Sequence, residues 1–259
     1  MGAAPGWRDY RINVLISLST AYLALPFGIA AGLWSAELRQ HLPWKSQSIT
    51  FHTLGALPVA GPVLEMAAMI LVPLVLHDMW FYWAHRIEHK VPLHWEFHKI
   101  HHSDERMNAS TFARDHFLQA TWIAFFPVFT LGLVVELDLS EAGQAALYSN
   151  MFLVVMSMFY HSAIRVRVPW LDRILVTPQV HRIHHSIDPE HYNRNFADAL
   201  PLFDILFGTY HRPGKDEFPS TGLGDRFPAP GSFWAAQFGP PWTLAKRLLS
   251  QRAFQKDMN

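Results

Sequence analysis

Four long apolar stretches dominate the hydropathy pattern of this 259-residue chain. Residues 12–36 and 117–135 contain no charged side chain, and the ionisable groups of residues 142–164 are two tyrosines and one histidine. Residues 54–76 form the fourth stretch and contain a single acid, Glu65. About 20 mostly apolar residues in a helix cross the hydrocarbon core of a bilayer. The pattern therefore predicts an all-α integral membrane protein with four transmembrane helices.

Buried core helices of a soluble protein are an alternative explanation, but four such lengths in so short a chain disfavour it. The first stretch also exceeds the roughly 7–15 apolar residues of a signal peptide. Residues 54–76 are the least regular of the four, because Glu65 and three prolines interrupt them. An acid inside a membrane is a functional hint by default, although Glu65 could instead face a neighbouring helix.

Basic residues indicate the orientation of these helices. Arg8 and Arg11 precede the first stretch, and five Lys or Arg residues lie between the second and the third. Residues 136–141 carry three acids and no base, whereas four arginines follow the last stretch at residues 165–182. Because cytoplasmic loops are enriched in Lys and Arg, both termini and the segments after the second and fourth stretches are expected in the cytoplasm.

Eleven of the 16 histidines lie between residues 85 and 185. Most of these belong to the segments that are expected in the cytoplasm. Positions i, i+3 and i+4 share one face of a helix, so clustered histidines aim their rings at a common point. Neutral imidazole is a preferred ligand of iron, copper, nickel and zinc. The spacing predicts a metal centre with eight candidate ligands: His85, His89, His98, His101, His102, His181, His184 and His185.

The residues around the histidines restrict the kind of metal chemistry. A zinc protease motif reads His-Glu-x-x-His, but Arg86 stands at the position of its general base. A soluble ferritin-like di-iron centre needs Glu-x-x-His pairs, and the chain has none. Bis-histidine haem does not explain the two His-x-x-His-His triplets. What remains is a centre of many imidazoles and few carboxylates, with about the right number of ligands for two ions.

Composition excludes other classes of function. The formal net charge is zero and no run of like charge occurs, so nothing predicts nucleic acid as a partner. The chain contains no cysteine, which excludes disulfides, thiolate metal sites and iron–sulfur clusters. It also lacks a Gly-x-Gly-x-x-Gly fingerprint for a dinucleotide. Any redox reaction at the metal centre would therefore need electrons from outside the chain.

Taken together, these motifs resemble the fatty acid hydroxylase and sterol desaturase superfamily. The resemblance covers about residues 70 to 212 and rests on Asp78-x-x-x-Tyr82-Trp83-x-His85-Arg86-x-x-His89, on His98-Lys99-x-His101-His102-Ser103, on Pro178-x-x-His181-Arg182-x-His184-His185-Ser186, on Asn195-Phe196 and on residues 203–210. It implies a single membrane-embedded domain over residues 1–259, with a cytosolic helical hub formed by about residues 77–116 and 161–212.

The resemblance further implies the chemistry of a membrane-bound non-haem di-iron oxygenase. Two iron ions would be the cofactor, O2 the co-substrate and a membrane lipid the substrate. His161 matches a further family histidine and becomes a ninth candidate ligand. The external electron donor would be a ferredoxin, a cytochrome or a reductase. Hydroxylation is favoured over desaturation because the sequence is more similar to bacterial hydroxylase-like members, and a zinc-dependent membrane hydrolase stays a further alternative.

Some residues depart from the family pattern or lie beside it. Members often have Arg-Phe-His-Pro where this chain has residues 114–117, so His116 could be structural rather than a ligand. Other histidines beside the motifs are expected to be structural or solvated: His77, His94 and His191. Asp78 and Glu88 are the acids nearest the first cluster and could orient imidazoles. The last 19 residues are expected to form an amphipathic helix at the membrane interface.

Overall fold

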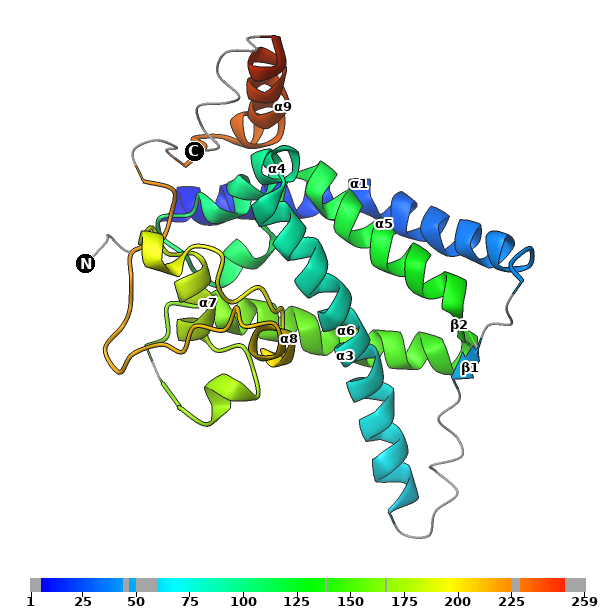
Figure 1. Ribbon diagram of the computed structural model, residues 1–259. Coiled ribbons are helices and arrows are strands. Elements are labelled where there is room, and N and C mark those ends of the chain that lie inside the picture. Colours follow the sequence, from blue (N-terminus) through cyan, green and yellow to red (C-terminus); the bar gives the residue numbers. More distant parts are fainter. Residues whose placement is uncertain are drawn as a thin grey trace.

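The computed structural model describes residues 6–43, 47–49, 60–137, 139–165, 167–224 and 229–249. Helices dominate this part of the chain (Figure 1), in the order α1 (Trp7–Arg39), α3 (Gly61–Lys90), α4 (Pro92–His102), α5 (Phe117–Val134), α6 (Leu139–Tyr160), α7 (Pro178–His184), α8 (Leu202–Leu206) and α9 (Phe233–Leu249). Single turns of 3-10 helix lie at η1 (Ala109–Ala113), η2 (Leu171–Arg173) and η3 (Pro189–His191). The helical class is confirmed, apart from one short parallel pairing of β1 (Gln47–Ile49) with β2 (Val135–Leu137).

Helices cover most of the described parts of all four predicted apolar stretches, although α6 ends at Tyr160, four residues before the fourth stretch does. Of the described helices, α1 and α3 are long and apolar enough to cross a membrane. The apolar segments Phe117–Leu133 of α5 and Tyr148–Tyr160 of α6 are shorter, counted over residues whose side chains the structure describes. Residues 54–59 of the second predicted stretch lie outside the described residues. Since no proline or glycine lies between Leu74 and Lys90, α3 runs on without a break to Lys90. A topology with four membrane crossings stays a prediction.

The two long helices are exposed to an unusual degree for apolar segments. In their most apolar stretches only 22% of the α1 residues and 11% of the α3 residues are buried. Leu18 and Leu25 on α1 are 65% and 63% exposed, and Val63 on α3 is 63% exposed. A core helix of a soluble protein would be mostly buried, and a large exposed apolar surface is unfavourable in water. These helices therefore indicate a membrane protein.

Close packing of α1 against α5 depends on small residues (Figure 1). Gly28 on α1 lies against Ala124, and Gly32, one turn later, lies against Val128. A Cβ added to Gly132 of α5 would overlap the Ser35 side chain. Small residues four apart let two helix backbones approach closely, which is the main source of helix association where lipid replaces water.

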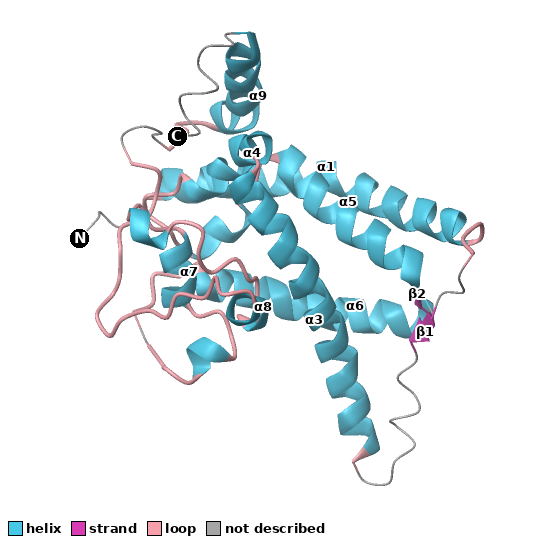
Figure 2. Cartoon of the chain, viewed as in Figure 1, coloured by secondary structure: helices cyan, strands magenta, loops and turns pink. Residues whose placement is uncertain are grey.

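The loops and short helices gather around α7 and α8, at one end of the long helices (Figure 2). The carboxyl ends of α3 and α6, the amino end of α5 and the whole of α4 meet there, while β1 and β2 lie at the far end of α5 and α6 (Figure 1). Since the histidine motifs belong to these converging ends, the fold brings three distant segments of sequence together.

Helix α9 packs against the amino-terminal part of α1 and against α4. Trp234, Phe238 and Trp242 are spaced four residues apart and are each more than half exposed. They form an aromatic face of the kind that lies at a membrane interface. The rest of the predicted carboxy-terminal helix, residues 250–259, lies outside the described residues.

Candidate metal centre

The structure gathers all nine candidate histidines into two neighbouring groups, in each of which the ligand atoms lie within 4.8 Å of one another. Helix α3 supplies two of these side chains, α4 three, the residue after α6 one, and α7 with the residue that follows it three. The first imidazole group consists of His85, His89, His98, His102 and His184. The second imidazole group consists of His101, His161, His181 and His185.

Local sequence explains how the helices present these rings. Val91 is extended (φ −99°, ψ 116°) and Pro92 starts α4, so the chain turns between the last histidine of α3 and those of α4. Thr177 caps α7 by accepting a hydrogen bond from the Val180 N–H, and Pro178 occupies the first helical position. Each histidine pattern therefore lies on a helix whose start is determined by its own sequence.

Within the first imidazole group, one nitrogen has more close contacts than hydrogen bonds can explain. His98 Nε2 lies 3.0 Å from His85 Nε2, 3.1 Å from His89 Nε2 and 3.0 Å from His102 Nε2. One imidazole nitrogen has either one proton or one lone pair, so it can satisfy only one of these contacts. Ligand nitrogens at right angles around an ion, each about 2.1 Å from it, lie about 3.0 Å apart. A shared cation fits this arrangement.

A buried nitrogen supports the same interpretation. His184 Nε2 belongs to the first imidazole group and has no hydrogen-bond partner among the described residues. A buried polar atom without a partner costs about 1–3 kcal/mol. Coordination of a metal ion would remove that cost.

The second imidazole group repeats this geometry. His161 Nε2 lies 3.2 Å from His101 Nε2 and 2.9 Å from His181 Nε2. His181 Nε2 in turn lies 2.9 Å from His185 Nε2. The rings of His102 and His185 stack with centroids 4.4 Å apart and so join the two groups. The site can therefore hold two cations side by side.

Hydrogen bonds to Nδ1 orient several of these rings. His85, His161 and His184 each donate from Nδ1 to a backbone carbonyl, those of Phe196 (2.7 Å), Ser157 (2.8 Å) and Arg194 (2.8 Å) respectively. Because neutral imidazole has one N–H, this bond leaves the lone pair on Nε2, directed into the group.

Glu88 is one of the two acids expected to orient imidazoles, and it lies beside the first group. Its Oε2 atom is 3.2 Å from His98 Nδ1, and the carboxylate is almost completely buried. The Gln119 amide lies 2.8 Å from the same nitrogen. Contacts of this kind fix the ring and make it a better ligand.

The prediction for Asp78 was wrong. Its carboxylate contacts no ring of the two groups and instead accepts three backbone N–H groups, those of Asp198 (3.1 Å), Ala199 (3.0 Å) and Leu200 (2.6 Å). Asp78 therefore acts indirectly, by fixing the loop after Phe196. Asp204, a residue that sequence reasoning did not single out, accepts the N–H groups of Phe196 and Ala197 and holds the start of the same loop.

Burial keeps the imidazoles in the neutral form that binds metals. It lowers the pKa of His102, His181 and His185 well below the usual value, and the charges of neighbouring histidines act in the same direction. Burial also lowers the pKa of His184, to about 3, against the opposite effect of its bond to the Arg194 carbonyl. At neutral pH these rings therefore offer lone pairs rather than positive charge.

The remaining histidines beside the motifs lie outside both groups. His116 accepts the Leu118 N–H on Nδ1 and donates from Nε2 to the Gln237 carbonyl, so it links α5 to α9. His77 pairs with Asp198, and the His94 ring packs on Trp122. His191 joins a third cluster with His211 and Glu217, two residues that the sequence analysis did not identify.

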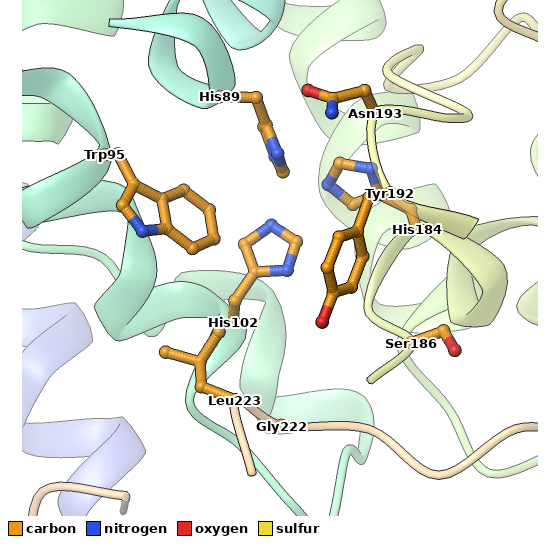
Figure 3. Close-up of a pocket in the computed structure, with 9 residues that line it drawn as sticks. All are labelled: His89, Trp95, His102, His184, Ser186, Tyr192, Asn193, Gly222 and Leu223. Atoms are coloured by element: carbon orange, nitrogen blue, oxygen red, sulfur yellow. The ribbon is translucent and has the colours of Figure 1, made fainter. Parts of the chain in front are cut away.

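A mostly apolar pocket of about 310 Å³ opens onto the first imidazole group (Figure 3). The rings of His89, His102 and His184 form one part of its wall, and Trp95 and Tyr192 lie on opposite sides of the hollow (Figure 3). Asn193, Ser186, Gly222 and Leu223 complete the lining. Such a pocket can hold an apolar ligand segment against the candidate metal centre.

Comparisons with known proteins find several relatives of this chain. The matched region is 29% identical to the ornithine lipid hydroxylase OlsE of Rhizobium tropici over 61% of this chain, and 31% identical to the alkylglycerol monooxygenase of Danio rerio over 51%. The matched regions cover 46% of the length of the Rhizobium protein and 28% of the length of the Danio protein. Human cholesterol 25-hydroxylase is 29% identical over 68% of this chain and 69% of its own length.

No solved structure matches the chain. The Fatty acid hydroxylase family profile matches residues 70–209, more than half of the chain and the segment that carries all nine candidate histidines. The chain therefore belongs to the fatty acid hydroxylase family.

Proposed function

We propose that this protein is a membrane-bound non-haem di-iron oxidoreductase that uses O2 and external electrons to hydroxylate a C–H bond of a lipid. The observation that carries the proposal is the pair of buried imidazole groups, each with ligand atoms within 4.8 Å of one another. Related proteins whose names specify ornithine lipid, alkylglycerol and cholesterol support a lipid as the substrate.

In this proposal each imidazole group holds one iron ion. Five nitrogens would surround the ion of the first group and four that of the second, so neither set fills all the positions of a six-coordinate ion. Bound iron would supply the redox chemistry that activates O2 toward an unactivated C–H bond. The carboxylate-poor ligand set differs from that of ferritin-like di-iron proteins.

The protein's own residues would position and shield the reaction. The carbonyls of Phe196, Ser157 and Arg194 hold three rings with Nε2 directed into the imidazole groups, where the ions would bind. Trp95 and Tyr192 would provide aromatic walls against which a lipid segment packs. Holding one carbon against the oxidant in this way is the main contribution that a protein makes to such a reaction.

The proposed topology has four membrane crossings, formed by α1, α3, α5 and α6, with the histidine hub and both termini in the cytoplasm. Support comes from the position of both imidazole groups at one end of these helices and from the basic residues that flank that end. A cytoplasmic hub would also be accessible to a soluble or membrane-bound reductase. A reporter fused after Lys90 should therefore read as cytoplasmic and one fused after Leu137 as external.

Two alternatives use the same site. A desaturase would remove two hydrogens from the lipid instead of inserting oxygen. A zinc hydrolase needs a general base beside the metal-bound water, but the described lining of the pocket contains no carboxylate. The lining of the pocket therefore favours an O2-dependent hydroxylase or desaturase over a hydrolase.

The proposal can be tested by lipid profiling of cells with and without the gene, together with iron analysis of the purified protein. The expected results are a lipid shifted by one oxygen atom and close to two irons per chain. His184→Ala should abolish the shift, because this side chain contributes a buried Nε2 to the first imidazole group.

His41→Ala is the matched control, since this histidine is 71% exposed and far from the hub. Its activity should stay near that of the wild type. Normal activity in the His184→Ala variant would contradict the assignment.

A further inference from the structure

A third cluster of metal-binding side chains lies beside the hub, formed by His191, His211 and Glu217. Its ligand atoms lie within 4.8 Å of one another. His191 Nε2 is 2.9 Å from Glu217 Oε1, and His211 Nε2 is 3.4 Å from Glu217 Oε2. Both imidazoles thus face the two oxygens of one carboxylate.

Further hydrogen bonds hold the residues of this cluster in place. His191 Nδ1 lies 2.9 Å from Ser186 Oγ, which in turn accepts the Asp188 N–H. This contact leaves His191 Nε2 directed at the carboxylate. The backbone N–H of His211 donates to Asn195 Oδ1 at 2.7 Å, and the Glu217 carboxylate accepts the backbone N–H of Gly214 at 2.6 Å.

From this geometry we propose that His191, His211 and Glu217 bind one divalent zinc ion, separate from the two imidazole groups. Two imidazoles and one carboxylate are a common ligand set for zinc, with water in the fourth position. The His191 side chain is 3% exposed, whereas those of His211 and Glu217 are 30% and 28% exposed. Solvent can therefore supply the fourth ligand.

The ion would tie a strap, residues 211–224, to the segment that follows α7. The strap already forms several hydrogen bonds with that region: the Ile187 N–H donates to the Ser220 carbonyl, and Arg182 Nε donates to the Pro219 carbonyl. Its far end brings Gly222 and Leu223 to the edge of the pocket (Figure 3). Zinc at this cluster would thus stabilise one wall of the pocket without entering it.

The simpler explanation is a cluster held by hydrogen bonds alone, in which both imidazoles donate to the carboxylate. The two explanations differ in their response to zinc. Zinc binding would be lost on replacement of a ligand, whereas a hydrogen-bonded cluster would bind no ion in the wild type either.

The test uses the full-length protein purified in detergent, to which zinc is added before desalting and metal analysis. Compared with the wild type, His211→Ala and Glu217→Gln should each contain one zinc fewer per chain. The loss of a direct ligand should weaken zinc binding by more than about 100-fold, since loss of an outer hydrogen-bond partner alone costs about 10–100-fold. His41→Ala serves as the control and should retain the wild-type zinc content.

Trypsin cleavage gives a second readout that is independent of catalysis. Lys215 is an exposed residue of the strap, so zinc should slow cleavage after it in the wild type but not in Glu217→Gln. Equal zinc contents in wild type and both variants, or cleavage that zinc does not slow in the wild type, would overturn the proposal. Neither readout needs turnover, so failure here is distinguishable from failure of the proposed hydroxylase function.

Discussion

Replacing Asp204 with alanine should disturb the loop that orients one imidazole of the first group. The buried Asp204 carboxylate accepts the N–H groups of Phe196 and Ala197, both at 2.8 Å, and the Thr209 hydroxyl at 2.7 Å. Alanine removes all three contacts. The Thr209 hydroxyl still has a tyrosine hydroxyl 3.0 Å away, but the two backbone N–H groups lose their partner.

The size of the effect follows from those two N–H groups. A buried donor left without a partner costs about 1–3 kcal/mol, so the loop should lose about 2–6 kcal/mol of stability. About 1.4 kcal/mol corresponds to a tenfold change in an equilibrium constant. The population ratio of closed to open loop should therefore decrease by a factor of between about 30 and 10⁴. Whole domains are stable by about 5–15 kcal/mol, so the lower part of this range opens the loop without unfolding the protein.

Hydrogen exchange at the amides of Phe196 and Ala197 measures this opening directly. Exchange in Asp204→Ala should be at least about 30-fold faster than in the wild type. The Phe196 carbonyl also accepts the Nδ1 proton of His85, so the variant should bind metal more weakly in the first imidazole group. Asp216→Ala is the control, because Asp216 is an exposed acid that is not part of this loop.

Unchanged exchange at the two amides would refute the claim that Asp204 holds the loop. Faster exchange with normal metal content would refute the link from the loop to the His85 ring.

Two further perturbations act on other contacts. Burial lowers the pKa of His116 from 6.5 to about 4, so below pH 6.5 the unfolded chain takes up a proton that the folded chain does not. Stability should fall by up to about 3 kcal/mol as the pH decreases from 6.5 to 4, and His116→Gln should remove that part of the pH dependence of thermal unfolding. Gly132→Val should lower the free energy of unfolding by about 1–3 kcal/mol, because the new side chain overlaps Ser35. Gly239→Ala is the control: no atom lies near the added methyl group, so the melting temperature in detergent should stay nearly unchanged.

The histidine-bearing helices could be predicted because their information is local. Spacings of three and four residues place rings on one helix face, and Pro92 and Pro178 mark where two of the helices begin. The division into two groups could not be predicted in the same way. His101 and His102 are adjacent in sequence but differ by about 100° around α4, so they point into different groups.

Contacts between distant segments explain what the sequence analysis missed. Asp78 lies 120 or more positions before the N–H groups that it accepts, and nothing in its local pattern indicates them. The third cluster likewise joins residues from η3 and from a Pro- and Gly-containing loop. A lone His or Glu in such a loop gives no periodic signal, so only the folded chain reveals that His211 and Glu217 meet His191.

A lipid hydroxylase of the proposed kind takes the oxygen atom of its product from O2. Membranes that contain the protein should be incubated with a reductase system and a lipid extract under ¹⁸O2, and the product analysed by mass spectrometry. We expect one ¹⁸O atom in the hydroxylated lipid, and none in lipid from membranes that contain the His184→Ala variant. A product whose oxygen comes from water would contradict the proposed function and indicate metal-assisted hydrolysis.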